Sequence, residues 1–306
     1  MKNQSNRILI ILGPTASGKS DLAVALAKEF NGEVISADSR QVYKGLDIGS
    51  GKITQKEMKG VPHYLLDVVN PQTVFTVEKF QKLANKKIEE IAKRGKLPII
   101  CGGTGFYIQA IVDDIVFPEV APNLGLRHHL ALEGLSELFA ILQALDPDRA
   151  KTIDARNPHR LIRAIEIATA LSAPSAKSLK LSAWSAKFQW EVLQIGIKTD
   201  REVLKERIEA RFIKRVKQGI VEEAKRLHKT GLTYKRFSEI GLAYKYMVFY
   251  LQNKISKEEF IKESIRAEQK YAKRQMTWFK RDKRIRWFEL SEVKKIRNEV
   301  SFFLKK

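Results

Sequence analysis

The sequence predicts an α/β protein: a P-loop parallel sheet with helices on both faces, interrupted by a helical insertion domain. Short apolar runs that end in glycine alternate with amphipathic helices along the first third of the chain. A glycine-rich loop follows the first of these runs. The alternation stops in the middle of the chain and resumes later, which predicts an insertion. Strand–helix alternation with glycine-rich strand ends is typical of a parallel sheet covered on both faces.

Three strands and two helices are expected in the first part of the core. Residues 7–13 (RILIILG), 32–39 (GEVISADS) and 96–103 (KLPIICGG) are short, apolar and rich in β-branched residues, as buried strands are. Apolar residues spaced three and four apart predict helices over 20–30 and 77–95, and a glycine closes the second helix.

The middle of the chain differs in character. Residues 124–146 and 157–171 have helical patterns, and 172–187 (SAPSAKSLKLSAWSAK) is a small, polar segment that we interpret as a connector. We therefore divide the chain into three parts: the first part of a P-loop catalytic core, 1–116; a helical insertion, 117–186; and a return to the core with basic C-terminal helices, 187–306.

The last part begins with a further strand. Residues 191–200 (EVLQIGIKTD) are expected to rejoin the sheet, and helical patterns follow over 201–219, 221–230 and 257–281. Residues 201–306 contain 30 Lys and Arg against 14 Asp and Glu, and they supply most of the net charge of +21. Aromatic residues lie among these charges, so a polyanion such as nucleic acid is the favoured partner.

Composition limits the possible classes of protein. The 306 residues include 44% hydrophobic and 30% charged residues, as in an ordinary globular chain, and no run of 18 apolar residues that could span a membrane. The N-terminal MKNQSNR lacks the apolar segment of a signal peptide, and the single cysteine, Cys101, excludes an intramolecular disulfide. We expect a cytoplasmic protein without membrane contact.

A phosphate-binding loop follows the first predicted strand. Gly13, Gly18, Lys19 and Ser20 have the GxxxxGKS spacing of the ATP-binding P-loop, between a strand and a helix. Glycines let backbone N–H groups turn toward an anion, the helix dipole favours negative charge, and the serine hydroxyl can bind Mg²⁺. The expected phosphate ligands are the loop residues Gly13, Pro14, Thr15, Ala16, Ser17, Gly18, Lys19 and Ser20.

The loop alone does not identify the reaction. The third strand ends in PIICGGTGFY without the acidic residue that P-loop NTPases use to hold their metal, and no guanine-reading NKxD is present. Asp38, at the end of the second strand, is the carboxylate best placed to act as a metal ligand or general base. It could instead only cap the turn that follows. From the sequence alone, Thr104 is likewise interpreted as a helix N-cap.

Six segments in order along residues 7–290 resemble the tRNA dimethylallyltransferases of bacterial type: GPTASGKS, VISADSRQVYKGLDIG, VPHYLLDVVNP, ICGGTGFYIQA, RIEARF and YAKRQMTWFKR. The resemblance implies transfer of a dimethylallyl group from dimethylallyl diphosphate to N6 of adenosine 37, beside the anticodon, without ATP hydrolysis. It implies that the P-loop holds the donor diphosphate with Mg²⁺ on Ser20. The absence of an acidic residue after the third strand agrees with a reaction that does not hydrolyse ATP.

The same resemblance implies roles for residues outside the P-loop. Asp38 would accept the N6 proton, Thr104 would bond near the reacting groups and Arg211 would bind the diphosphate. Contacts to the anticodon stem-loop would come from Asp38, Ser39, Arg40, Gln41, Thr104, His159, Arg160, Leu161, Ile162 and Arg163. Arg160 and Arg163 are the strongest choices in the second segment, since residues three apart share one helix face. A monomer is expected.

Two segments depart from the family pattern. The chain has DIGSGKI at 47–53 where the family often has DIGTAKP, so Gly51 and Ile53 are unusual, and IGLAYKY at 240–246 is longer than the common IGYKE. Three other functions remain as alternatives: an isopentenyltransferase acting on free adenine nucleotides, a P-loop kinase or ATPase, and a non-catalytic RNA-binding protein. The basic face and insertion argue against the first, and the missing acid against the second. The intact Gly13, Lys19, Asp38, Thr104 and Arg211 argue against the third.

Overall fold

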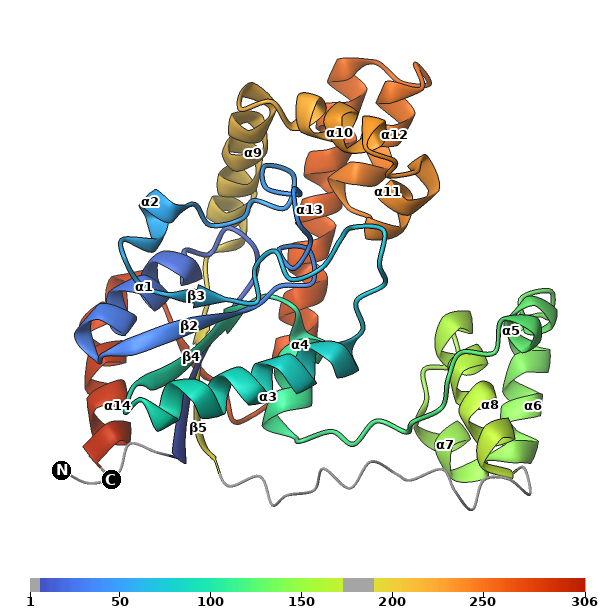
Figure 1. Ribbon diagram of the computed structural model, residues 1–306, viewed down its shortest axis with the longest axis horizontal. Helices are drawn as coiled ribbons and strands as arrows, with labels where there is room; N and C mark the ends of the chain where they lie inside the picture. The colour runs from blue at the N-terminus through green and yellow to red at the C-terminus, as the bar shows by residue number, and fades with distance from the viewer. Residues whose placement is uncertain (1–5, 173–189, 306) are drawn as a thin grey trace. The chain divides into compact units, whose positions relative to one another are not determined.

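The computed structural model describes residues 6–172 and 190–305 (Figure 1). The chain forms two compact units, one of Met1–Asp113 and Gln189–Lys306 and one of Asp114–Phe188. All but the first residue of the 172–187 connector lies outside the described residues. Each unit is described by itself below.

The first unit contains a six-stranded sheet in which every pair of neighbours is parallel. The strand order is β3-β2-β4-β1-β5-β6, so the first strand lies inside the sheet. The strands are β1 (Arg7–Leu12), β2 (Gly32–Ala37), β3 (His63–Tyr64), β4 (Leu97–Gly102), β5 (Glu191–Ile197) and β6 (Arg286–Phe288). The predicted parallel sheet is confirmed, and its two edge strands were not expected.

Helices cover both faces of this sheet, as the sequence predicted. Because strand side chains alternate between faces, Leu9 and Ile11 join a buried cluster with residues of α1 (Lys19–Glu29) and α14 (Val293–Lys305), while Ile8 and Ile10 point the other way. The opposite face packs against α3 (Val77–Lys93). The helix α4 (Gly105–Val112) contacts α3 and continues from the end of β4.

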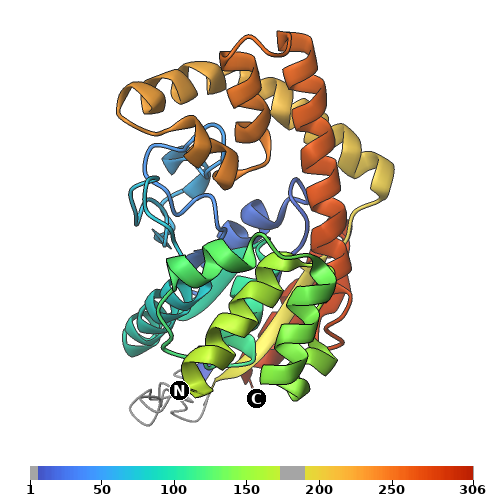
Figure 2. The same cartoon turned by 90° about the vertical axis from the view of Figure 1, so that its right-hand side faces the viewer.

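The C-terminal helices form a separate layer of the same unit. The helices α9 (Arg201–Lys217) and α13 (Lys257–Phe279) contact each other, and α10 (Ile220–Lys229), α11 (Tyr234–Ile240) and α12 (Ala243–Leu251) gather near one end of α13 (Figures 1 and 2). The other end of α13 reaches α4. The sequence predicted α9, α10 and α13. It did not predict α11 and α12.

The second unit is a small helical bundle. Its helices are α5 (Leu124–Leu130), α6 (Leu135–Leu145), α7 (Pro147–Thr152) and α8 (Pro158–Ser172). Leu138, Leu142, Leu161 and Ile165 form its core. The helical pattern at 124–146 is divided in two, because Gly134 begins α6 as its N-cap.

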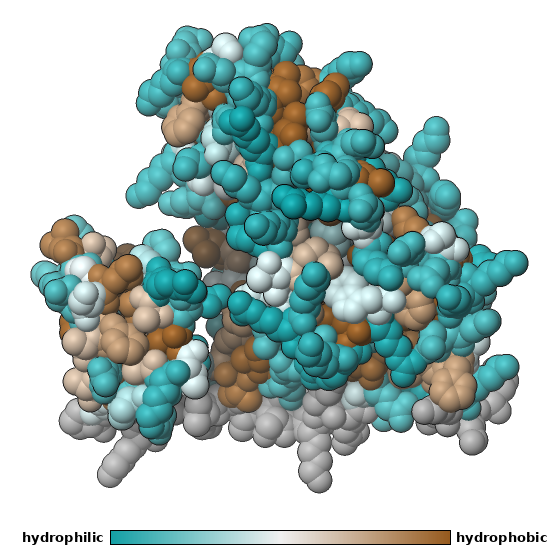
Figure 3. Space-filling model, turned by 180° about the vertical axis from the view of Figure 1, so that it is seen from behind, coloured by the Kyte–Doolittle hydropathy of each residue, from teal (hydrophilic) through white to brown (hydrophobic). Residues whose placement is uncertain are grey.

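The remaining elements of the first unit are short: α2 (Gln55–Met58) and the 3₁₀ turn Leu290–Glu292. No helix among the described residues has the length and apolar character needed to cross a membrane. The face drawn in Figure 3 is largely hydrophilic, with hydrophobic residues scattered over it.

Candidate active site

The P-loop leaves β1 and enters α1 by a backbone path that favours glycine. Gly18 has a φ of +84°, and Gly13 has a φ of +154° with its hydrogen facing the carbonyl oxygen of Ile197, which would lie 2.8 Å from a β-carbon. Because that neighbour is backbone of the adjacent strand, a side chain at Gly13 would displace the loop from the sheet. The helix α1 begins at Lys19, which places its positive dipole end at the loop.

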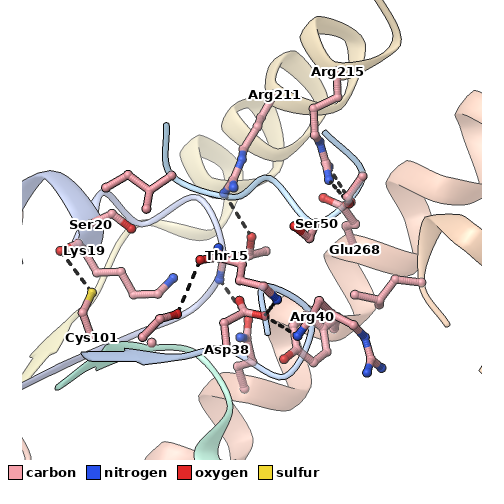
Figure 4. Close-up of a pocket in the computed structure, with 18 of the residues that line it drawn as sticks. Thr15, Lys19, Ser20, Asp38, Arg40, Ser50, Cys101, Arg211, Arg215 and Glu268 are labelled. Carbon is pink, nitrogen blue, oxygen red and sulfur yellow. Dashed lines mark hydrogen bonds and ion pairs between the residues drawn. The ribbon is translucent and has the colours of Figure 1, made fainter. Parts of the chain in front are cut away.

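Lys19 of α1 and Arg211 of α9 both lie at this loop (Figure 4). The Lys19 ammonium donates to the Pro14 carbonyl at 3.1 Å. Arg211, on α9, donates to the Gly51 carbonyl at 2.9 Å, and its Nη1 lies 3.4 Å from the Thr15 hydroxyl. The structure therefore brings the predicted diphosphate ligands Lys19 and Arg211 to the same loop, although they are far apart in the sequence.

Both cations are electrostatically unfavourable where they lie. Burial lowers the pKa of Lys19, and the positive charge of Arg211 lowers it further, although Cys101 and Asp38 oppose this. Burial also lowers the pKa of Arg211, with a second contribution from Arg215. A bound polyanion would relieve the desolvation and repulsion of both groups at once. These charges fit an anion such as a diphosphate.

Asp38 and Thr104 lie at the carboxyl ends of adjacent strands. Asp38 follows β2, and its Oδ1 accepts from the N–H groups of Arg40 at 2.8 Å and Gln41 at 3.3 Å. Thr104 follows β4 and begins α4, but its hydroxyl accepts from the Ser39 N–H at 3.0 Å and makes no bond to the helix it precedes. Thr104 does occupy the N-cap position of α4, as the helix-cap interpretation predicted, but its hydroxyl does not cap the helix. The turn-capping interpretation of Asp38 describes only one of its oxygens.

Two cavities meet at the P-loop. Thr15, Asp38, Arg40, Gln41 and Ser50 line the first, and Ala16, Gly18, Asp47, Lys52 and Arg207 line the second, which has a volume of about 780 Å³. Lys19, Ser20, Ile53, Arg211 and Arg215 line both. A diphosphate held by Lys19 and Arg211 would therefore face Asp38 on one side and the larger cavity on the other. Such an arrangement can support transfer of a group from a diphosphate to an acceptor beside Asp38.

Cys101 lies beneath the P-loop, at the first cavity (Figure 4). Its thiol donates to the Lys19 carbonyl at 3.7 Å. Burial is the main cause that raises the pKa of this thiol to about 11. Among the described residues, no group of three His, Cys, Asp or Glu side chains could hold a metal ion.

The segment from His159 to Arg163 opens α8 in the second unit. His159 and Arg160 are exposed, whereas Leu161 is fully buried and Ile162 packs against the core. Arg163 forms an ion pair with Glu166 and donates to the Val120 carbonyl at 2.9 Å. Within this segment, the exposed side chains available to a nucleic acid are therefore His159 and Arg160, and the tRNA contact of the segment stays a prediction.

Glu166 organises the second unit electrostatically. Partial burial raises its pKa, but hydrogen bonds from Arg127 and Arg163 outweigh this and lower the pKa to about 2. The Asn123 N–H adds a bond of 2.6 Å. Arg163, one of the strongest sequence choices for an RNA contact, thus has an internal partner.

Sequence reasoning missed Gln275 of α13. Its side chain is 6% exposed, accepts from the Thr15 N–H at 2.9 Å and donates to the Gly103 carbonyl at 2.8 Å, so it joins the P-loop to the end of β4. It stands within YAKRQMTWFKR, one of the segments of the family resemblance, which was the only sequence signal for it. The buried residues Arg215, Glu223 and Glu268 gave no such signal.

Comparisons with known proteins identify a family to which the chain is similar. A family model described as IPP transferase matches residues 41–282. The chain is 42% identical to a tRNA dimethylallyltransferase of Thermoanaerobacter sp. (strain X514), covering 94% of this chain and 93% of the relative, and 39% identical to one of Bacillus pumilus, covering 95% and 92%. The structure of a tRNA isopentenylpyrophosphate transferase from Bacillus halodurans matches with a TM-score of 0.74 and 36% identity, covering 98% and 97%. A eukaryotic dimethylallyltransferase acting on tRNA matches with a TM-score of 0.73 and 26% identity, covering 90% and 70%.

Proposed function

The chain belongs to the IPP transferase family, and we propose that it transfers a dimethylallyl group from dimethylallyl diphosphate to N6 of adenosine 37 in tRNA, releasing diphosphate. The observation that supports this best is the convergence of Lys19, Arg211 and Asp38 on one cavity at the carboxyl edge of the sheet. Thr104 accepts a hydrogen bond from Ser39, the residue that follows Asp38. We also propose that it acts as a cytoplasmic monomer.

In the proposed reaction, the N6 nitrogen attacks the allylic C1 of the donor. The C1–N bond forms as the C1–O bond breaks, and the electron pair of that bond leaves on the diphosphate. Lys19, Arg211 and the P-loop backbone stabilise the charge that develops on the leaving oxygens, because their positions are set before the reaction begins. Arginine suits this task since its planar group donates in pairs.

The proton of N6 goes to Asp38. The backbone N–H groups of Arg40 and Gln41 both donate to Oδ1 of this carboxylate. These two bonds fix the orientation of the carboxylate just beyond the end of β2. This leaves Oδ2 for the amine. Thr104 fixes the neighbouring Ser39 N–H, so the segment that bears Asp38 is anchored to β4.

Mg²⁺ fits the donor chemistry of the site. Ser20, the second residue of α1, is exposed on the wall of both cavities, and a hydroxyl oxygen together with phosphate oxygens is a set that Mg²⁺ accepts. When bound there, the ion would neutralise charge on the diphosphate.

The acceptor base must leave its stack to reach Asp38. Bases of a single-stranded loop are the easiest to extrude, and the first cavity presents the polar side chains of Arg40 and Gln41 for reading an extruded adenine. The exposed His159 and Arg160 of α8 would contact the RNA backbone.

Transfer of labelled dimethylallyl groups to unmodified tRNA tests this proposal. We expect incorporation at adenosine 37 that requires Mg²⁺ and is abolished by EDTA. Asp38→Asn, which keeps the acceptor for the backbone bonds, should lower the rate by about 100-fold or more. Glu78→Gln, at an exposed acid in the first turn of α3, is the matched control. Prenylation of AMP or ADP without tRNA, or ATP hydrolysis without transfer, would contradict the proposal.

A further inference from the structure

We propose that Glu223, a buried residue of α10, is a positioning residue that sets the place of the Arg211 guanidinium. It does so through the loop of residues 47–51, here called the brace loop. The inference rests on the proposed function only in taking Arg211 as a ligand of the donor diphosphate.

Glu223 holds the start of the brace loop by its backbone. Its carboxylate is 2% exposed; Oε2 accepts from the N–H groups of Asp47 at 2.8 Å and Ile48 at 2.7 Å, and Oε1 accepts from the Gly49 N–H at 2.9 Å. Three successive N–H groups aimed at one anion form a nest that fixes the conformation of the residues that donate. The Tyr244 hydroxyl donates to Oε1 at 3.0 Å and orients the carboxylate.

The middle of the brace loop is clamped from a second direction. The Gly49 carbonyl accepts from Arg215 Nη1 at 3.0 Å, and Arg215 is buried in an ion pair with Glu268 of α13. A β-carbon on Gly49 would lie 2.1 Å from the Tyr244 hydroxyl, so the loop is pressed against this side chain. Little freedom remains at Gly49.

The end of the brace loop contacts Arg211. Gly51, two residues beyond Gly49, has a φ of +60°, and its carbonyl accepts from Arg211 Nη2 at 2.9 Å. A β-carbon at Gly51 would lie 2.2 Å from the same Nη2 atom. A shift of the loop would therefore either release the guanidinium or push it away from Thr15 of the P-loop, 3.4 Å from Nη1.

Lys52 secures the chain just after the brace loop. Its ammonium donates to the Tyr43 carbonyl at 3.0 Å and to the Asp47 carboxylate at 2.6 Å. The bond to Asp47 closes the loop on itself. Glu223 of α10 and Arg215 of α9 join the loop to the C-terminal helices, and Glu223 is the group that holds its first three N–H groups. The position of Arg211 relative to the P-loop thus depends on Glu223 as well as on α9.

Glu223→Gln tests this step, because glutamine keeps the size but presents an amide N–H₂ toward backbone N–H groups. We expect the KM for dimethylallyl diphosphate and the Kd for inorganic diphosphate to rise roughly tenfold, while the KM for tRNA stays within about twofold. Glu222→Gln, at the exposed neighbour on α10, should change neither constant. Thermal unfolding checks that the variant is folded. If Glu223→Gln does not fold, the same measurements are made on Glu223→Asp, which keeps the negative charge on a shorter side chain.

A double-mutant cycle with Arg211→Ala separates positioning from general loss of structure. If Glu223 acts through Arg211, then Glu223→Gln should cost little further diphosphate affinity in the Arg211→Ala background. Additive losses, or an equal rise in the KM for tRNA, would overturn the inference and leave the proposed function intact. An Arg211→Ala protein that binds diphosphate like the wild type would overturn both.

Discussion

Arg211 in the first unit and Arg163 in the second were both predicted from sequence to bind a substrate, yet their surroundings differ. Arg163 pairs with Glu166, a carboxylate of its own helix. Arg211 meets a carbonyl and a hydroxyl, and none of the ion pairs among the described residues includes it. A partly buried cation bonded only to neutral acceptors retains its affinity for an anion, whereas a cation already paired with a carboxylate stabilises the fold. From this difference we expect Arg211 to bind a ligand and Arg163 to stabilise the second unit, a division that the sequence prediction did not make.

Loss of Arg211 should have the largest effect on ligand binding. Arg211→Met keeps the aliphatic stem but removes the guanidinium, and we expect the Kd for inorganic diphosphate to rise about 100-fold, since hydrogen bonds to charged groups contribute about 1.5–3 kcal/mol each. Calorimetric titration measures this. The control is Lys217→Met, at an exposed cation that is the last residue of α9. If the two variants have the same Kd for diphosphate, the anion is held by the overall positive charge of the protein and not by the position of Arg211.

Loss of Glu166 should act on stability and not on donor binding. Glu166→Gln leaves Arg127 and Arg163 without their anion, and both arginines are about a third exposed, so we expect a loss of about 1–2 kcal/mol. Hydrogen exchange would show faster exchange at the amides of α8, while the Kd for diphosphate stays unchanged. Unchanged exchange in α8 would show that the Arg163–Glu166 pair is not structural.

The stabilisation that Glu166 provides to the second unit should depend on pH. The folded-state pKa of Glu166, about 2, lies below its ordinary value of 4.5, so the stabilisation is present above pH 4.5 and is lost as the pH falls from there toward 2. The difference in unfolding free energy between wild type and Glu166→Gln should therefore be constant near pH 7 and shrink below pH 4.5. Urea unfolding at several pH values measures it. A difference that grows on acidification would reverse the assignment.

The smallest effect is expected at Arg160, which is exposed on the same helix as Arg163 and 4.0 Å from Asp154. Arg160→Ala should weaken tRNA binding a few-fold and reduce the slope of log Kd against log salt by about 1, with no change in hydrogen exchange. Arg163→Ala should instead increase exchange in α8. Should the two variants behave alike, the division between structural and RNA-facing arginines in α8 fails.

Long, strongly patterned elements of the fold were predictable. The apolar runs of β1, β2, β4 and β5 are buried on both sides, so their composition alone indicated strands. The edge strands β3 and β6 have two and three residues, too few for a pattern, and they exist because longer neighbours offer hydrogen-bonding partners. The division of 124–146 into α5 and α6 occurs at Gly134, inside a helical pattern that continues on both sides of it and so did not indicate the break.

The site was predictable where local motifs or the family resemblance marked it. Lys19 belongs to a local pattern, and Asp38 and Thr104 end predicted strands. Gln275 and Glu223 act on backbone groups 260 and 174 residues away, and nothing in their own neighbourhood indicates this. Such contacts follow only from the way α10 and α13 approach the sheet, which the sequence pattern does not specify.

Cys101 has a practical consequence for labelling. It is the single cysteine of the chain, buried beneath Lys19, and a thiol with a pKa of about 11 is almost entirely protonated at neutral pH. Maleimides react with thiolates, so this residue should modify slowly. A cysteine introduced at the exposed Arg160 position of α8 should then take up a fluorophore selectively, without removal of the native residue. The wild-type sequence can therefore serve as the starting protein for site-specific labelling.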